Sequence, residues 1–101
     1  MIGTSTSQSL DPAMQVLASK NVLAAELGGE VSLLDVKSGV YFTLNAVGAT
    51  VWRLVQNAKS LAELKQSLLE EYDVEPERCE QDLRHLVTEL RSSGLVELIA
   101  A

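Results

Sequence analysis

Cysteine, histidine and aromatic residues are all scarce in this chain of 101 residues. It has one cysteine, Cys79, and one histidine, His85, and aromatic residues make up only 4% of it. A single cysteine excludes an internal disulfide, and the two residues together are too few for a zinc site of the Cys/His type. We therefore expect no structural metal and no cofactor.

Basic residues and long apolar runs are also few. Eight Lys and Arg stand against 14 Asp and Glu, and the formal net charge of -6 repels phosphate backbones. The longest uncharged stretch, Ser38 to Trp52, is shorter than the roughly 20 residues of a membrane helix. Residues 1–10 carry no Lys or Arg and do not resemble a secretory signal. We expect a cytoplasmic protein with no nucleic-acid and no membrane partner.

Candidates for catalysis are equally sparse. An active site needs a base, a nucleophile or a metal placed against a partner group. Cys79 falls on the apolar stripe of an expected helix, where a free cysteine is more often a core residue than a nucleophile. His85 stands alone on the flank of that helix, and no spacing singles out a pair of carboxylates. The sequence predicts a protein that is not an enzyme.

The first half of the chain predicts an antiparallel meander of three strands. The expected strands are Val22 to Leu27, Glu30 to Val36 and Val40 to Leu44. Gly28-Gly29 is typical of a tight hairpin turn, and Gly39 ends the second turn. Because Leu33 and Leu34 are adjacent, neither face of the sheet is clearly polar, and we expect helices or tails to cover much of both.

The second half predicts three helices, which makes the chain an α+β protein with an outline like a winged helix-turn-helix. The helices are expected from the cap at Asn45 to Asn57, from the Ser60 capping box to Tyr72, and from Pro76 to Gly94. Leu95 to Ile99 is expected to lie extended on the core. Residues 1–20 are assigned to a flexible tail and residues 21–101 to a single domain.

The winged-helix outline raises the alternative of a transcription regulator. Such a protein needs a basic stripe on the helix that enters the major groove. The third helix instead carries more acids than bases: Glu75, Glu77, Glu80, Asp82 and Glu89 against Arg78, Arg84 and Arg91. This balance disfavours DNA binding.

The third strand is unusual because it lacks every common protection of a sheet edge. Val40 to Leu44 contains no charge, no Pro and no internal Gly, yet the last strand of a meander has only one neighbour. Two interpretations stay open from the residues alone. Either the edge is covered by the chain itself, through Met14 to Ser19 or the C-terminal segment, or by a second copy, or it accepts an extended peptide as an added strand.

A set of short motifs between Val22 and Leu98 resembles the PqqD-like family, small domains that recognise the leaders of ribosomally made and modified peptides. The matching residues are Leu33-Leu34-Asp35, Gly39, Tyr41-Phe42, Leu44-Asn45, Gly48-Ala49, Trp52, Tyr72-Asp73-Val74, Pro76-Glu77, Asp82-Leu83, Leu90 and Gly94-Leu95-Val96. The solitary domain is most similar to those that accompany lasso-peptide leader proteases. Similar domains serve radical-SAM modification enzymes, as in the synthesis of pyrroloquinoline quinone.

The resemblance implies a non-catalytic peptide chaperone that holds the leader of a precursor peptide on its third strand, beside its third helix. It would present the leader to a leader protease, a radical-SAM enzyme or another modifying enzyme. The implied peptide-binding residues are Val40, Tyr41, Phe42, Thr43 and Leu44 on the strand, and Cys79, Asp82, Leu83, Leu86 and Val87 on the helix. Acidic Asp82 and Glu80 would favour a basic leader, whereas Arg84 or Arg78 would favour an acidic one, and the sequence leaves this open.

Overall fold

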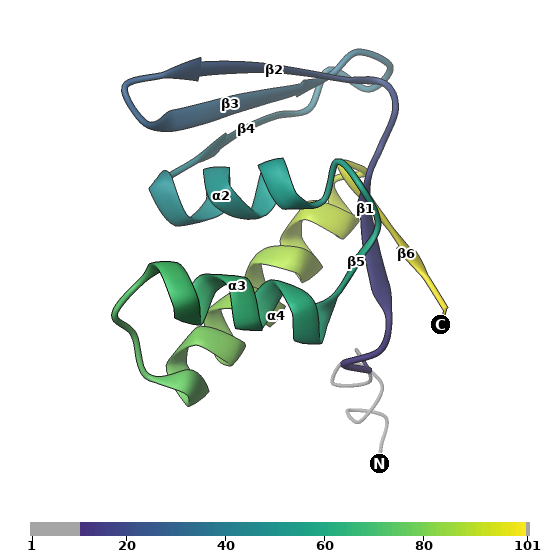
Figure 1. The fold of residues 1–101 in the computed structure, drawn as a ribbon. Helices are drawn as coiled ribbons and strands as arrows, with labels where there is room; N and C mark the ends of the chain where they lie inside the picture. The colour runs from purple at the N-terminus through teal and green to yellow at the C-terminus, as the bar shows by residue number, and fades with distance from the viewer. Residues whose placement is uncertain (1–10, 101) are drawn as a thin grey trace.

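The structure, a computed structural model, describes residues 11–100, which form two small antiparallel sheets and three helices (Figure 1). One sheet has the order β2-β3-β4, with β2 Val22–Leu27, β3 Glu30–Asp35 and β4 Tyr41–Leu44. The other has the order β5-β1-β6, with β1 Gln15–Ala18, β5 Lys59–Ser60 and β6 Val96–Ile99. The helices are α2 Ala46–Leu54, α3 Leu61–Glu71 and α4 Pro76–Ser92. The predicted α+β class with a meander followed by three helices is confirmed.

Local turn chemistry sets the register of the β2-β3-β4 sheet. Gly28 and Gly29 have φ of 63° and 85°, the positive values that a tight hairpin with the native strand twist requires. The next turn is closed by Asp35, whose carboxylate accepts from the Lys37 N–H at 3.1 Å and the Ser38 hydroxyl at 2.8 Å. That turn ends β3 at Asp35, one residue before the expected end.

Within residues 11–100, only one face of this sheet is covered. Figure 1 shows α2 beneath the sheet and no described element above it. Leu33 and Leu34 point to opposite faces, so that Leu33 is fully buried and Leu34 lies half-buried on the outer face. Leu23, Leu27 and Tyr41 on that face are 62%, 85% and 66% exposed. For the described residues, the expectation that helices or tails would cover much of both faces is therefore wrong, because the described helices all pack on the inner side.

The helix starts follow the predicted caps. Asn45 Oδ1 accepts from an N–H of the first turn of α2 at 3.0 Å. Ser60 and Glu63 form a reciprocal capping box at the start of α3, with distances of 3.0 Å and 2.9 Å. α2 ends at Leu54, three residues before the expected Asn57, because the chain turns there to enter β5.

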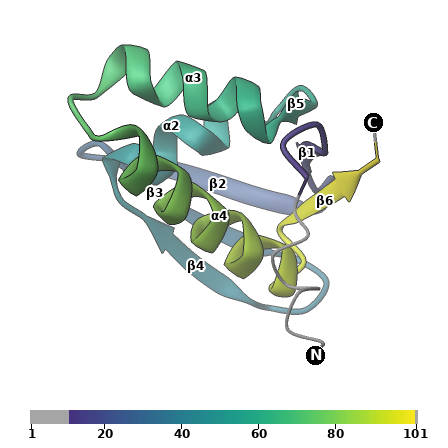
Figure 2. The ribbon, with the colours of Figure 1, turned by 90° about the horizontal axis from the view of Figure 1, so that it is seen from below.

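The β5-β1-β6 sheet corrects the expected N-terminal tail. β1 lies inside residues 1–20 yet pairs along its whole length with β6, beside which Figure 2 shows it, and Val16 is fully buried. Residues 15–18 are therefore part of the domain, while residues 1–10 of the assigned tail lie outside the described residues. Four residues of weak pattern form a strand here because their partner Val96–Ile99 lies at the other end of the sequence. That partner also confirms the extended C-terminal segment.

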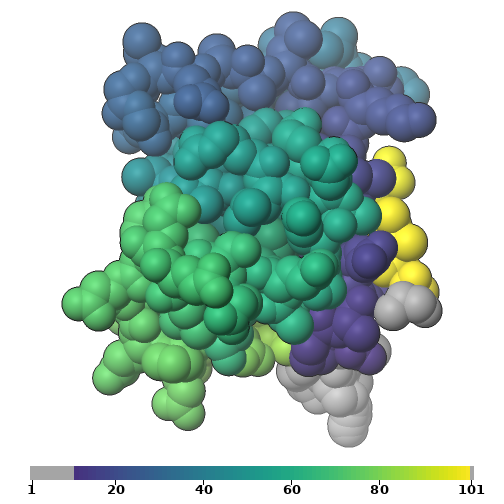
Figure 3. Space-filling model, viewed as in Figure 1, coloured from purple at the N-terminus to yellow at the C-terminus, as the bar shows by residue number. Residues whose placement is uncertain are grey.

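The core lies between the sheets and the helices. Its largest fully buried side chains come from every layer: Leu33, Leu64, Leu90, Leu95, Val16, Val31, Val51, Val55 and Val87. Figure 3 shows α2 and α3 filling one face of the molecule, with the β2-β3-β4 sheet as its outer layer. No helix in the part of the chain that the structure describes is long and apolar enough to cross a bilayer.

Candidate functional site

β4 is a free edge within the described residues. The strand order β2-β3-β4 leaves it with β3 as its single neighbour. The two segments of the chain that were candidates to cover it, Met14 to Ser19 and the C-terminal strand, contribute instead to the other sheet, where β1 and β6 pair with each other. Between residues 11 and 100, no segment of the chain itself occupies this edge.

The register shows which backbone groups of β4 face outward. Asp35 donates its N–H to the Val40 carbonyl at 2.9 Å, which makes these two residues a hydrogen-bonded pair. Bonded and non-bonded pairs alternate along an antiparallel ladder, so Phe42 bonds to β3 in turn. The N–H and C=O groups of Tyr41 and Thr43 therefore point to the open edge.

A cavity of about 540 Å³ lies beside this edge, between β4, the start of α2, the end of α3 and one side of α4. Its apolar lining consists of Phe42, Leu44, Val47, Gly48, Val51, Leu68, Val74, Leu83 and Leu86. Its polar lining consists of Thr43, Asn45, Tyr72, Cys79, Asp82, His85 and Glu89. A mostly apolar groove next to free main-chain groups has the two parts that binding by strand addition uses.

Most of the predicted site residues line this cavity, and three of them do not. The residues that line it are Phe42, Thr43, Leu44, Cys79, Asp82, Leu83 and Leu86. Val87 is instead fully buried in the core, and the Tyr41 side chain lies on the outer face, with its hydroxyl 3.1 Å from Ser32 Oγ. Val40 precedes β4 and does not line the cavity. A role of these residues in peptide binding stays a prediction.

The α2 and α3 walls were missed by the sequence reasoning. Val47, Gly48 and Val51 reach the cavity because only one residue separates the end of β4 at Leu44 from the start of α2 at Ala46. A Cβ at position 48 would lie 3.0 Å from Leu44 Cβ, so the glycine permits the close approach of helix and strand. The continuous strand, cap and helix pattern was the signal that could have placed these residues beside the edge.

The α3 wall is held in place by a hydrogen-bond network. The Tyr72 hydroxyl lies 2.8 Å from Thr50 Oγ1, and the Thr50 residue is only 4% exposed. Arg53 also donates to this oxygen, at 3.1 Å, and Thr50 reaches the Ala46 carbonyl at 3.2 Å. Because its hydroxyl is anchored to α2, the Tyr72 ring forms a fixed end to the cavity.

Glu80 lies outside this cavity, although the sequence placed it beside the cleft. It lines a smaller cavity of about 180 Å³ together with Lys65 and Arg84. Lys65 Nζ and Arg84 Nε lie 2.9 Å and 3.1 Å from its two oxygens, and these hydrogen bonds hold the pKa of Glu80 below its usual value. Glu80 is thus engaged in fastening α4 to α3.

Cys79 lies against the cavity and is 4% exposed. Burial raises the pKa of its thiol, as do the nearby carboxylates of Asp82 and Glu80, while Lys65 acts in the opposite direction. We expect iodoacetamide to alkylate Cys79 much more slowly at pH 8 than it alkylates the same chain unfolded in urea, because little thiolate is present and access is limited. Mass spectrometry of timed samples measures both rates, and equal rates would contradict the buried placement.

Within residues 11–100, no three His, Cys, Asp or Glu side chains are grouped to hold a metal ion. The arrangement at β4 offers main-chain hydrogen bonds, apolar volume and two carboxylates. These are the means of holding a ligand.

The family model and the similar solved structures point to the same family. The model of the family described as coenzyme PQQ synthesis protein D matches residues 30–96, more than half of the chain. The solved structure of TbiB1 in complex with the TbiA(beta) leader peptide is 34% identical, with a TM-score of 0.74, and the match covers 80% of this chain and 94% of that one. A lasso peptide synthetase B1 complexed with its leader peptide is also 34% identical, with a TM-score of 0.69 and coverage of 81% and 96%. No curated protein matches. The chain therefore belongs to the PqqD family and is a PqqD-like recognition element of the kind found in the biosynthesis of ribosomally made, modified peptides.

Proposed function

We propose that this protein binds the leader of a precursor peptide as an added antiparallel strand on β4. The supporting observation is that an unpaired strand edge runs along a largely apolar cavity of about 540 Å³. The similar solved structures, which hold leader peptides, support the same ligand class. Alternate side chains of the added strand enter the cavity between β4 and α4, and the others face solvent beside Tyr41.

The energetics suit a reversible complex. Tyr41 and Thr43 offer outward N–H and C=O groups, and each main-chain hydrogen bond contributes about 0.5–1.5 kcal/mol net. Such bonds accept almost any sequence, so selectivity comes from side chains in the cavity. Two apolar anchors contribute about 1.5–3 kcal/mol each, less the cost of ordering the peptide, which gives a Kd on the order of micromolar.

The bound leader is presented to a separate enzyme, a role that membership of the PqqD family supports. A leader protease of the lasso type is the preferred partner, because one of the similar structures is a lasso peptide synthetase B1 at 34% identity. A radical-SAM or other modifying enzyme is the second candidate, because the matching family model is that of a coenzyme PQQ synthesis protein.

Tyr41→Pro tests the strand-addition mode. Proline removes the outward N–H at the first residue of an edge strand, a position where proline is tolerated. The probe is the tightest-binding peptide selected on this protein from a displayed library of random linear peptides. We expect Tyr41→Pro to weaken its binding about threefold to tenfold, the equivalent of one hydrogen bond, measured by isothermal titration calorimetry.

The matched control is Tyr41→Thr, which removes the ring but keeps the N–H. It should bind the selected peptide within about twofold of the unmodified protein, and circular dichroism should show both variants folded. Equal affinity of Tyr41→Pro and Tyr41→Thr would contradict strand addition at β4, and so would a library that yields no binder.

A further inference from the structure

The charged groups that line the β4 cavity are of one sign. Asp82 and Glu89 are its carboxylates, and no Lys or Arg lines it. Both acids come from α4, which in Figure 2 runs alongside β4. They are seven residues apart, which corresponds to about 10 Å along the helix axis, with Leu86 between them on the same side.

Both carboxylates retain capacity for a new partner. Asp82 Oδ2 lies 3.1 Å from Arg78 Nε, but the two side chains are 68% and 69% exposed. Replacing such an exposed ion pair with a contact to another cation costs little free energy. Glu89 faces His85 at 3.5 Å, a charged contact only when the imidazole is protonated. Because a carboxylate has about four acceptor sites, each acid can take a further donor without losing its present contact.

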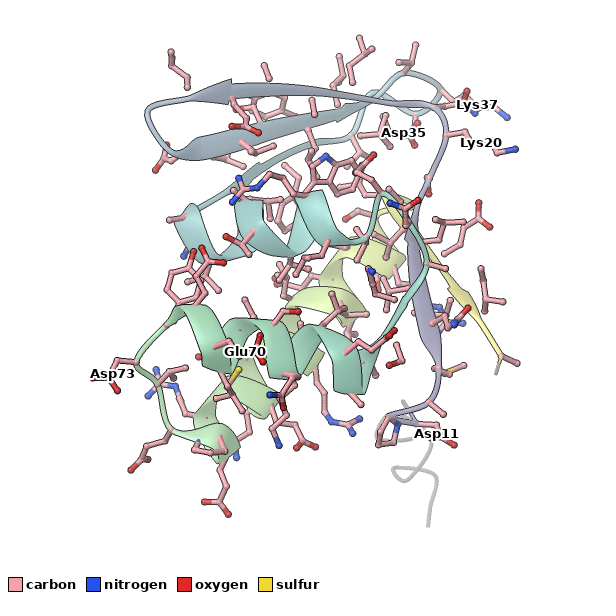
Figure 4. The ribbon with its side chains drawn as sticks, in the orientation of Figure 1. Asp11, Lys20, Asp35, Lys37, Glu70 and Asp73 are labelled. Atoms are coloured by element: carbon pink, nitrogen blue, oxygen red, sulfur yellow. The ribbon has the colours of Figure 1, made fainter. Side chains whose placement is uncertain are left out.

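No Lys or Arg among residues 11–100 lines the cavity, although Arg78 contacts its carboxylate Asp82. Arg84 lines the smaller cavity and contacts Glu80, and Arg78 lines neither cavity. Figure 4 shows Lys20 and Lys37 together at the end of the β2-β3-β4 sheet that lies away from the junction of β4 and α2. An acidic leader side chain in the cleft would therefore meet carboxylates and find no cation among the lining residues.

We infer that the peptide this protein recognises carries Lys or Arg on the side facing α4, where the cation pairs with Asp82 or Glu89. This inference rests on the proposed function. The two acids are farther apart than one cation spans, so each forms a separate position for a basic side chain, and the aliphatic stem of that side chain packs on Leu86. A bound strand also removes water from the carboxylates, which strengthens their attraction for a cation and their repulsion of an acid.

The test compares library selections on two proteins. The unmodified chain and the double variant Asp82→Lys/Glu89→Lys are each panned against the displayed library of random linear peptides. We expect Lys or Arg to recur at a fixed distance from an apolar anchor on the unmodified chain, and Asp or Glu to replace it on the double variant. Changing the recurring Lys to Glu in a selected peptide should weaken binding to the unmodified chain about tenfold and restore it on the double variant.

Glu30→Lys/Glu97→Lys is the control, because it changes the net charge equally at two exposed acids that do not line the cavity. It should select the same basic peptides as the unmodified chain. Selected peptides that lack a charge preference, or a preference that the control reverses as well as the cleft variant, would overturn the inference and leave strand addition standing. Failure to select any peptide would remove the proposed function itself.

Discussion

Replacing Val47 by Asp is expected to weaken binding of the selected peptide by a hundredfold or more while the domain stays folded. Val47 lines the cavity, is 40% exposed and is the second residue of α2. A carboxylate in the first turn of a helix stabilises the helix, so folding tolerates the change. When the peptide binds, however, the new carboxylate loses water without gaining a partner, which costs about 3 kcal/mol or more in addition to the lost apolar contact.

Ala46→Asp is the matched control for this variant. It places the same charge in the same helical turn, but Ala46 is exposed and does not line the cavity. Isothermal titration calorimetry should show Ala46→Asp within about threefold of the unmodified protein, since only long-range charge changes. Equal losses for the two variants would show that the peptide does not enter the cavity at the start of α2.

Val16→Asp is expected to unfold the domain. Val16 is fully buried at the centre of the β5-β1-β6 sheet, where it opposes Lys59 on one side and Leu98 on the other. Burying an unpaired carboxylate there costs several kcal/mol, a large share of the roughly 5–15 kcal/mol that stabilises a domain of this size. Urea denaturation followed by circular dichroism should show loss of the cooperative transition or a shift of several kcal/mol.

Asn21→Asp adds the same charge at an exposed position between β1 and β2. Its free energy of unfolding should stay within about 0.5 kcal/mol of the unmodified value. Val16→Ala provides a milder variant that should remain folded at reduced stability. If Val16→Asp unfolded at the same urea concentration as Asn21→Asp, β1 would be the flexible segment that the sequence suggests.

The elements that follow from the sequence are those determined by nearby residues. Gly28-Gly29 specifies a hairpin within a few residues, and the Ser60 to Glu63 capping box begins α3 where the pattern places it. β1 is different, because its four residues gain stability from β6, almost at the other end of the chain. A local sequence pattern does not indicate a pairing partner so distant in the chain, which is why Gln15–Ala18 was assigned to the tail.

The candidate site shows a similar division. The open edge at β4 could be argued from its unprotected composition, and the α4 wall came from the family resemblance. The orientation of α4 could not be assigned, because successive residues of a helix are rotated by about 100°. An error of one residue therefore moves a side chain from the face at the cavity to the face at the core. For this reason the sequence placed Val87 and Glu80 at the cleft and did not include Glu89. In the structure Val87 is buried in the core and Glu80 contacts Lys65, whereas Glu89 lines the cavity.

The most direct test of strand addition is amide hydrogen exchange in β4, with and without the selected peptide, measured by NMR. In the free protein the amides of Phe42 and Leu44 point to β3 and should be protected, whereas those of Tyr41 and Thr43 face the open edge and should exchange quickly. Saturating peptide should slow the exchange of Tyr41 and Thr43 by at least about tenfold relative to β2, whose outer edge serves as the internal reference. Unchanged exchange at Tyr41 and Thr43 under saturating peptide would contradict the account.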